Sequence, residues 1–250
     1  MKALRIASLL ALPLLVLSLS TSSSFAASGP GFGRLYSLAP AQADGFVAVD
    51  HLRLEQHPSA AKVRKFVHDQ GGARGLQAAI GLGLVPGKDI VRSLSFNIGY
   101  DEADIISGPF DVDALRKRAQ SRLKGSFEAG EQGGKGWFTL AKGRRFVLLE
   151  EGAACIGKAS MLAKILERGA KKGKALTTRP SFSAMLAPAK KAKASVWGGG
   201  WTSKRMRNMA KEKGSPPVAA IKRTRFHIAG SGEVVVEAAF VTGKAQEAKA

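Results

Sequence analysis

Hydrophobic and polar residues alternate most clearly between residues 136 and 169, where three short apolar runs follow one another. The runs are separated by Lys142-Gly143 and by Glu150-Glu151-Gly152, which supply the glycine and charge that turns need. Strands joined by such short turns are antiparallel neighbours, so the segment predicts a β-meander. Apolar residues at helical spacing predict a helix after the meander: Met161, Leu162, Ile165 and Leu166. We expect the meander and this helix to form the centre of the core.

The residues before the meander predict a strand, two helices and a hairpin. Gly45 to Asp50 has the pattern of a strand, and apolar residues at helical spacing predict helices over residues 59–70 and 76–84. Apolar and polar side chains alternate between Arg92 and Gly99, which predicts a strand with one buried face and one wet face. Asp101 to Asp104 then supply the expected hairpin turn.

The order of predicted elements before the meander recurs after it. A return strand and a helix capped by Asp111 complete the first series, strand–helix–strand–strand–helix, over residues 45–124. The same series fits residues 194–250, which predicts an internal duplication.

These elements predict an α+β fold, with a mostly antiparallel sheet covered by helices mainly on one face. We expect a signal peptide over residues 1–26, a flexible leader over 27–43 and a single α+β domain over 44–250. Within that domain, halves 45–124 and 194–250 are expected to flank the central meander 136–169.

The first 26 residues have the pattern of a signal peptide. Lys2 and Arg5 precede the apolar run LLALPLLVLSL, and Ser24-Phe25-Ala26 forms a small-residue cleavage site. Later apolar runs all fall short of the roughly 20 residues that a membrane-spanning helix needs. We therefore expect an exported protein, periplasmic or extracellular, with no transmembrane span after cleavage.

Positive charge is unevenly distributed along the chain. The sequence carries 39 Lys and Arg against 19 Asp and Glu, a formal net charge of +20. Between Lys158 and Arg225 there are 18 Lys and Arg but only two acids. Such a span favours anionic partners: an anionic lipid, lipopolysaccharide or another polyanion. Export argues against nucleic acid as the partner, and the oligomeric state stays open.

Two tryptophans within the basic span mark a candidate anion-binding face. They flank three consecutive glycines and precede a basic helix and strand, and indole beside cations is typical of lipid interfaces and of stacked bases. The alternative interpretation is a solubilising charged surface with the tryptophans in the core. The candidate residues are Trp197, Trp201, Lys204, Arg205, Arg207, Lys211, Lys213, Lys222, Arg223 and Arg225.

No catalytic signature accompanies this charge. The pairs Ser59/Lys62 and Ser121/Lys124 have the serine–lysine spacing of acyl-enzyme chemistry but lack the companion Lys-Thr-Gly motif. The run GLGLVPGKD has the wrong glycine spacing for a phosphate-binding loop. We therefore predict no catalytic residues and no cofactor.

The histidines and the single cysteine carry bland interpretations as well. His51 and His57 with Asp50 or Glu55 suggest a metal site, but such sites need three or four convergent ligands, so surface or capping histidines are favoured. Cys155 has no partner for an intrachain disulfide, and a small buried hydrophobe is the expected role. The predicted function is a non-catalytic exported envelope protein, and the alternative is an exported hydrolase with a dispersed active site.

Two turn motifs carry a resemblance to known proteins. Gly83-Leu84-Val85-Pro86-Gly87-Lys88-Asp89 precedes the predicted paired strands, and Gly108-Pro109-Phe110-Asp111 starts the helix after them. With the later apolar meander, this pattern resembles a group of exported bacterial α+β proteins of unknown function over residues 38–245. The resemblance implies export and an α+β fold but no activity.

Overall fold

A computed structural model of the chain describes residues 29–69, 74–141, 143–169, 174–202, 208–209, 212, 221–229 and 235–242. The predicted signal peptide, residues 1–26, lies outside the described residues. The strands are β1 (Gly45–Asp50), β2 (Arg92–Ile98), β3 (Asp101–Ser107), β4 (Ala129–Gln132), β5 (Lys135–Ala141), β6 (Arg144–Glu150), β7 (Ala153–Gly157), β8 (Val196–Trp201), β9 (Ile221–Ala229) and β10 (Val235–Thr242). The helices are α1 (Phe32–Leu38), α2 (His51–Glu55), α3 (Ala60–Asp69), α4 (Arg74–Gly81), α5 (Val112–Leu123), α6 (Ala159–Gly169) and α7 (Phe182–Lys191), with short 3-10 turns at Lys124–Ser126 and Leu176–Thr178.

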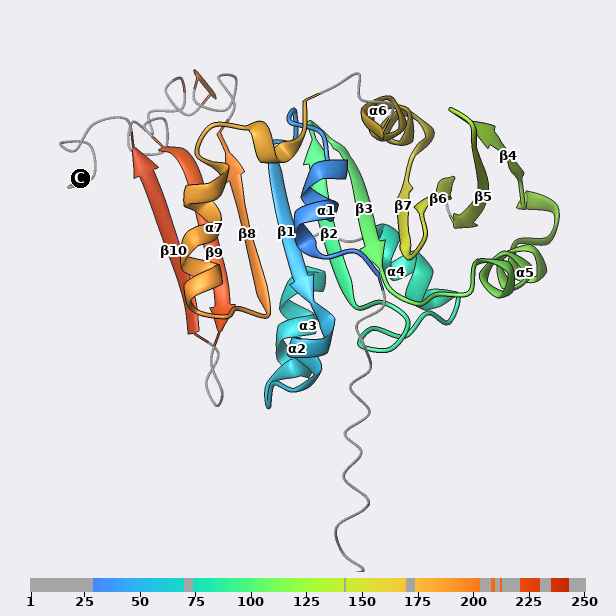
Figure 1. Cartoon of the computed structure of the whole chain (residues 1–250), viewed down its shortest axis with the longest axis horizontal. Helices are drawn as coiled ribbons and strands as arrows, with labels where there is room; N and C mark the ends of the chain where they lie inside the picture. The colour runs from blue at the N-terminus through green and yellow to red at the C-terminus, as the bar shows by residue number, and fades with distance from the viewer. Residues whose placement is uncertain are drawn as a thin grey trace, which may run out of the picture.

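In this part of the chain, ten strands form one sheet in the order β10-β9-β8-β1-β2-β3-β7-β6-β5-β4 (Figure 1). Every neighbouring pair of strands is antiparallel. The predicted α+β fold with an antiparallel sheet covered by helices is therefore confirmed.

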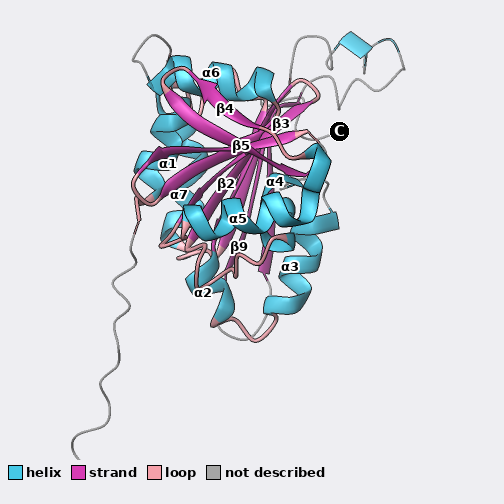
Figure 2. Cartoon of the chain, turned by 90° about the vertical axis from the view of Figure 1, so that its right-hand side faces the viewer, coloured by secondary structure: helices cyan, strands magenta, loops and turns pink. Residues whose placement is uncertain are grey.

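Helices cover both faces of the sheet, so the expectation that they lie mainly on one face is wrong (Figure 2). Side chains of α1, α6 and α7 join those of the sheet in one apolar cluster. On the opposite face α4 and α5 contribute to a second cluster, and α2 and α3 contribute to a third. The alternation within a strand divides the sheet residues accordingly, since Cys155 belongs to the first cluster and its neighbours Ala154 and Ile156 to the second.

The polar face of β2 is buried, not wet as predicted. Ser93 is 1% exposed and Ser95 is 6% exposed. Ser93 Oγ lies 2.9 Å from His51 Nε2 and Ser95 Oγ donates to Asp104 Oδ1, so both hydroxyls find partners inside the protein. Alternation alone cannot distinguish a strand face that meets water from one whose polar groups are paired beneath helices.

Residues 32–43 are part of the core, so the flexible leader predicted over 27–43 is wrong there. α1 buries Leu35 and Tyr36 against the sheet, and fully burying an apolar side chain contributes roughly 1.5–3 kcal/mol. Arg34 Nε also donates to Glu150 Oε1 on β6, at 2.8 Å. The small and glycine-rich sequence concealed a helix because only a few of its residues carry the buried apolar surface.

The hairpin turn predicted at Asp101–Asp104 is also misplaced. These residues begin β3, and the chain turns at Gly99 and Tyr100 instead. Gly99 has φ +61°, a left-handed conformation that glycine adopts without steric cost. Of the acids that suggested a turn, Glu102 and Asp104 accept hydrogen bonds from the first residues of α4, and Asp101 pairs with Lys158.

The meander and its helix are confirmed as β5, β6, β7 and α6. They lie toward one end of the sheet, however, whereas β2 and β3 occupy its middle, so the meander is not the centre of the core as expected. The predicted cap of α5 is also present, because Asp111 Oδ1 accepts a hydrogen bond from Ala114 N at 2.9 Å.

Two three-stranded meanders, β1-β2-β3 and β8-β9-β10, lie side by side because β1 pairs with β8. Most of the helix predicted between β8 and β9 lies outside the described residues, as does the whole segment after β10. The internal duplication, the two halves and the single domain over 44–250 therefore stay predictions. Among the described helices, none is both long and apolar enough to cross a membrane.

Candidate anion-binding site

Half of the predicted basic face can be located. Lys204, Arg205, Arg207, Lys211 and Lys213 lie outside the described residues. On β9, Arg223 pairs with Trp201 and Arg225 with Gly199, so these two arginines share the face of β8 that carries the tryptophans. Lys222 is exposed and, by the alternation of the strand, lies on the opposite face. The described strand cations are therefore divided between two faces of the sheet.

Both tryptophans are half-buried and pack against the core. Trp197 Nε1 donates to Tyr36 Oη at 2.7 Å, and the Trp197 ring meets the edge of Phe32 at 4.6 Å between centroids. The Arg179 guanidinium lies over the Trp201 ring, 3.9 Å from its centroid. These contacts are those of the alternative interpretation, in which the indoles stabilise the fold. Anion binding by this face stays a prediction.

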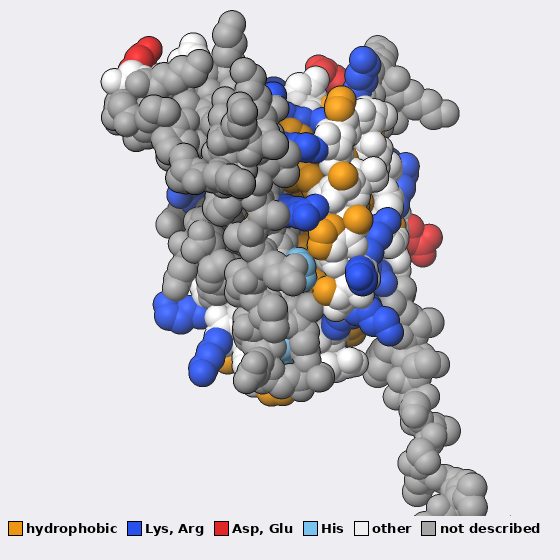
Figure 3. Space-filling model, turned by 90° about the vertical axis from the view of Figure 1, so that its left-hand side faces the viewer, with side chains coloured by type: hydrophobic (Ala, Val, Ile, Leu, Met, Phe, Trp, Pro, Cys, Tyr) orange, Lys and Arg blue, Asp and Glu red, His pale blue; other side chains and the backbone are white. Residues whose placement is uncertain are grey.

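Arg223 and Arg225 border a small cavity of about 110 Å³ between β9 and α7. Arg225 Nη1 donates to the Ala184 carbonyl at 3.1 Å, so this guanidinium already has a partner within the protein. On this side of the molecule, Lys and Arg side chains are interleaved with apolar ones and do not form one continuous patch over the described surface (Figure 3).

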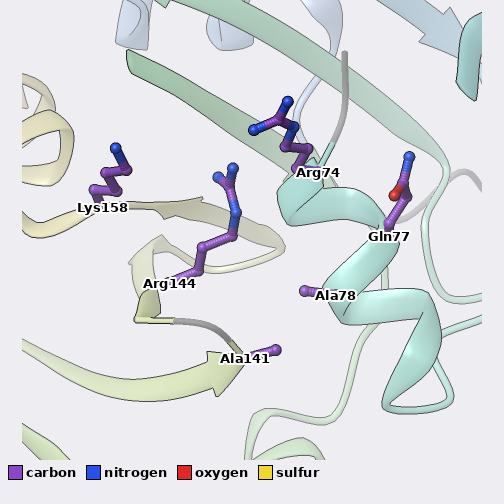
Figure 4. A pocket seen from close by; sticks show the side chains of 6 residues that line it. All are labelled: Arg74, Gln77, Ala78, Ala141, Arg144 and Lys158. Carbon is purple, nitrogen blue, oxygen red and sulfur yellow. The ribbon is translucent and has the colours of Figure 1, made fainter. Parts of the chain in front are cut away.

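A larger pocket, of about 510 Å³, lies at the start of α4 on the other face of the sheet. Three cationic side chains from three separate segments line it, and their charged ends are turned to the same side (Figure 4). We call it the cationic pocket. Its lining residues are Arg74, Gln77, Ala78, Ala141, Arg144 and Lys158.

The register of the sheet brings these segments together. Ala103 near the start of β3 pairs with Gly157 at the end of β7, and Gly157 also pairs with Arg145 at the start of β6. Arg144 pairs with Ala141 at the end of β5, across a tight turn with an irregular register. Lys158 follows β7 directly. The pocket thus lies where four neighbouring strands end beside α4, which packs on β3, β5 and β7.

Two acids of β3 fix the start of α4. Asp104 Oδ2 accepts hydrogen bonds from Gly75 N at 2.7 Å and Leu76 N at 3.1 Å, and Glu102 Oε1 accepts from Arg74 N at 2.7 Å. Carboxylates are favourable at a helix N-terminus because its first N–H groups lack partners within the helix. The capped N-terminus places Arg74 at the rim of the pocket.

Asp104 is fully buried beneath this helix start. The pKa of Asp104 is raised to about 6, chiefly by burial and to a lesser extent by the charge of Glu102, while hydrogen bonds from Ser95, Leu76 and Gly75 oppose the increase. A Cβ atom on Gly75 would lie 2.5 Å from Asp104 Oδ2, so only glycine lets the helix approach the carboxylate this closely.

The three cations differ in their protein partners. Lys158 Nζ pairs with Asp101 Oδ1 at 3.2 Å and its side chain is 61% exposed. Within the described ranges, no carboxylate pairs with the side chain of Arg74 or Arg144. Arg144 Nη1 is buried and has no hydrogen-bond partner among the described residues. A buried donor without a partner is costly, so turning the guanidinium toward an anion in the pocket would give this donor a partner.

The described lining of the pocket offers hydrogen-bond donors for an anion. Among these lining residues there is no carboxylate, histidine, cysteine or hydroxyl group that would serve as nucleophile or general base. No group of three or more possible metal ligands occurs within the described part of the chain.

Three of the histidines and the cysteine are buried. The expectation was surface or capping histidines, and a surface position is wrong for His51 and His227, which are 4% and 5% exposed. His57 does have a capping role, since its Nδ1 accepts from Ser59 N at 3.0 Å just before α3. Cys155 is buried and free, as expected for a small hydrophobe, and burial raises the pKa of its thiol well above the usual value.

Sequence reasoning missed the cationic pocket. Arg74, Arg144 and Lys158 occur in three unrelated local contexts, and only the sheet register brings them together. The basic segment Lys142-Gly143-Arg144-Arg145 was the available signal. The sequence does not show which of its arginines lies on the α4 face of the sheet. Arg145 lies 3.7 Å from the centroid of the Trp137 ring on the opposite side of the sheet from Arg144.

The fold and the pocket define an α+β protein with a helix-covered antiparallel sheet and a cationic recess at one end of its strands. No model of a known protein family matches the chain, and no curated protein matches it. Crystal form I of TP0453 is similar to this chain with a TM-score of 0.53 and 10% sequence identity, over 84% of this chain and 79% of that chain. Crystal form III of TP0453 gives a TM-score of 0.49 and 13% identity, over 84% and 80%. The likeness to crystal form I is one of fold alone.

Proposed function

We propose that this chain is an exported, non-catalytic protein of the bacterial envelope that binds an anionic group of an envelope component in the cationic pocket. The observation that carries the proposal is the convergence of Arg74, Arg144 and Lys158 on one pocket, with no acid among its described lining residues. Charge-assisted hydrogen bonds are stronger than neutral ones, and guanidinium groups match the geometry of oxyanions.

The distribution of charge supports the same proposal. The basic span between Lys158 and Arg225 gives the protein a field that attracts anionic surfaces and polymers at long range. The predicted face with Arg223 and Arg225 would strengthen that attraction, and the pocket would supply the specific contact. Long-range attraction is screened by salt, whereas contacts in a recess are screened less.

The alternative of an exported hydrolase draws no support from this pocket. Hydrolysis needs a nucleophile or an activated water with a base beside it. The lining offers cations, one amide at Gln77 and two alanines instead. Binding without chemistry is therefore the favoured function.

Export is the part of the proposal that rests on the first 26 residues. Cleavage after Ala26 would leave a mature chain that begins at Ala27. Mass spectrometry of the protein recovered from its native host measures this N-terminus directly. An intact Met1 in the soluble cytoplasmic fraction would contradict export and, with it, the envelope as the place of action.

Pocket binding is tested by calorimetric titration of the mature chain with inorganic phosphate, glycerol 3-phosphate, sulfate and citrate at low salt. At least one of these anions should bind, and replacing any pocket cation with glutamine should weaken that binding by about tenfold or more. The reason is that a hydrogen bond to a charged group contributes roughly 1.5–3 kcal/mol, and each 1.4 kcal/mol is a factor of about ten.

The matched control removes the same charge elsewhere on the same face of the sheet. Lys62, Arg116 and Lys117 are exposed cations on α3 and α5. The variant with all three changed to glutamine should bind as the wild type does, while the variant Arg74→Gln/Arg144→Gln/Lys158→Gln should not bind. Equal loss in both variants would reduce the effect to net charge, and failure of all four anions to bind the wild type would sink the proposed function.

A further inference from the structure

We infer that the cationic pocket recognises a phosphate monoester, the dianionic group at the end of a small phosphorylated molecule or lipid. The inference rests on the proposed function and adds the chemical class of the ligand. It follows from the charge left unpaired in the pocket, from the geometry of its donors and from the neutral part of its lining.

The charge of the pocket suits a dianion. Lys158 is paired with Asp101, whereas the guanidinium groups of Arg74 and Arg144 have no carboxylate partner among the described residues. Glu102 lies nearby, but its Oε1 accepts from the backbone of Arg74. Because a backbone N–H carries no charge, Glu102 still offsets part of the positive charge, and the two guanidinium groups without a carboxylate partner among the described residues remain as donors for a ligand. A phosphate monoester carries about −1.5 to −2 at neutral pH, while a sulfate ester, a phosphodiester and a single carboxylate each carry about −1.

The donors are arranged to meet several oxygens at once. Arg74 comes from the start of α4, Arg144 from the start of β6 and Lys158 from the residue after β7, so the cations approach from different elements (Figure 4). A guanidinium presents a fork of N–H groups that matches two oxygens of one phosphate, and an ammonium adds a point charge. A monoester has three terminal oxygens to share among these donors, and a diester has only two.

Arg144 contributes a further specific feature. Its Nη1 is buried and has no hydrogen-bond partner among the described residues, so turning the guanidinium toward a terminal phosphate oxygen in the pocket would satisfy this donor. Lysine at this position would retain the charge but lose the fork. The comparison of Arg144→Lys with wild type therefore separates geometry from net charge.

The remaining lining indicates a small, polar ligand body. Ala78 and Ala141 are short side chains that leave space, and Gln77 offers an amide that can donate to or accept from a hydroxyl group. The volume of about 510 Å³ falls within the range of small-molecule sites, so it holds more than the phosphate alone. Glycerol 3-phosphate is a soluble probe with these properties, and phosphatidic acid carries the same monoester on a membrane.

The test compares four probes on the mature wild-type chain: glycerol 3-phosphate, a methyl phosphodiester of glycerol 3-phosphate, glycerol 3-sulfate and glycerate. Glycerol 3-phosphate should bind at least about tenfold more tightly than each of the others, the factor expected for one additional charge-assisted hydrogen bond. The Arg144→Lys variant should lose about tenfold of the affinity for the monoester and most of its preference over the sulfate. Arg74→Gln, at an exposed position, gives a second variant should Arg144→Lys fail to fold.

The outcomes separate this inference from the proposed function. The monoester inference would be overturned if glycerol 3-sulfate, the phosphodiester or glycerate bound as tightly as glycerol 3-phosphate. If Arg74→Gln still abolished that binding, the anion-binding function would stand. No pocket-dependent binding of any probe would overturn both. Vesicles that contain phosphatidic acid distinguish the source: vesicle binding that glycerol 3-phosphate displaces supports the lipid, whereas binding of glycerol 3-phosphate without binding to the vesicles supports a free ligand.

Discussion

Asp104 on β3 and His51 on α2 are buried ionisable side chains that contact the serines of β2. Burial shifts their pKa values in opposite directions. The pKa of Asp104 is raised to about 6, chiefly by burial, and the pKa of His51 is lowered to about 4 by burial and by the charge of Arg64. The contribution of Asp104 to stability is therefore present below about pH 4 and is lost as the pH rises through about 6. The contribution of His51 is present above about pH 6.5 and is lost as the pH falls through about 4.

These two contributions should nearly cancel in the wild type between pH 4 and 6. In the Asp104→Asn variant the slope from His51 remains alone, so stability relative to wild type should increase as the pH rises across this range. In His51→Gln the slope from Asp104 remains, so relative stability should decrease instead. Each effect is on the order of 3 kcal/mol, because one pKa unit corresponds to about 1.4 kcal/mol.

Denaturant unfolding at a series of pH values measures both slopes. The difference between variant and wild type at each pH removes the contribution of every other titrating group. Parallel pH profiles for wild type and Asp104→Asn would contradict the buried, protonatable Asp104, and parallel profiles for His51→Gln would contradict the buried neutral His51.

At the same scale, the sequence predicts the role of a residue whose partners are local, but not of one whose partners lie far along the chain. The pattern of Asp111 before an amphipathic segment predicts its cap correctly, because the hydrogen bond to Ala114 is local. The role of Asp104 could not be predicted in this way, because its partners Gly75 and Leu76 belong to a helix that is distant in the sequence. A single sequence contains no signal that joins them. The cationic pocket was missed for the same reason.

At the scale of elements, alternation and spacing predicted most strands and helices close to where they lie. β1, β2, the meander β5–β7 and helices α3 to α6 all follow periodic patterns. The misplaced turn at Asp101–Asp104 shows the limit of composition, because acids cluster at turns and also cap helices from a neighbouring strand. α1 was missed because it is only seven residues long, lies in a segment rich in Gly, Pro and Ala, and depends on tertiary contacts for its stability.

The wet face predicted for β2 failed for a related reason. Ser93 and Ser95 alternate with apolar residues as in a sheet that faces water on one side. In the protein these hydroxyls bond to His51 and Asp104 beneath the helices of the second face. Periodicity reports which side chains share a face, and the environment of that face depends on elements far along the chain.

At the scale of the whole molecule, the antiparallel sheet with helices on both faces explains where a site can form. The helices bury the flat faces of the sheet, so a recess arises at the ends of the strands, where α4 meets β5, β6 and the residue after β7. The net charge and the basic span were evident from the sequence, and they led to the prediction of an anionic partner. The position of the recess and the three side chains that line it required the fold.

The most direct test of this account is a crystal structure of the mature chain with glycerol 3-phosphate, at a concentration near the dissociation constant measured in solution. The account predicts phosphate oxygens within hydrogen-bond distance of Arg74 and Arg144, including Arg144 Nη1, with Lys158 beside them. A phosphate bound instead at Arg223 and Arg225, or an empty cationic pocket in a protein that binds the ligand in solution, would contradict it.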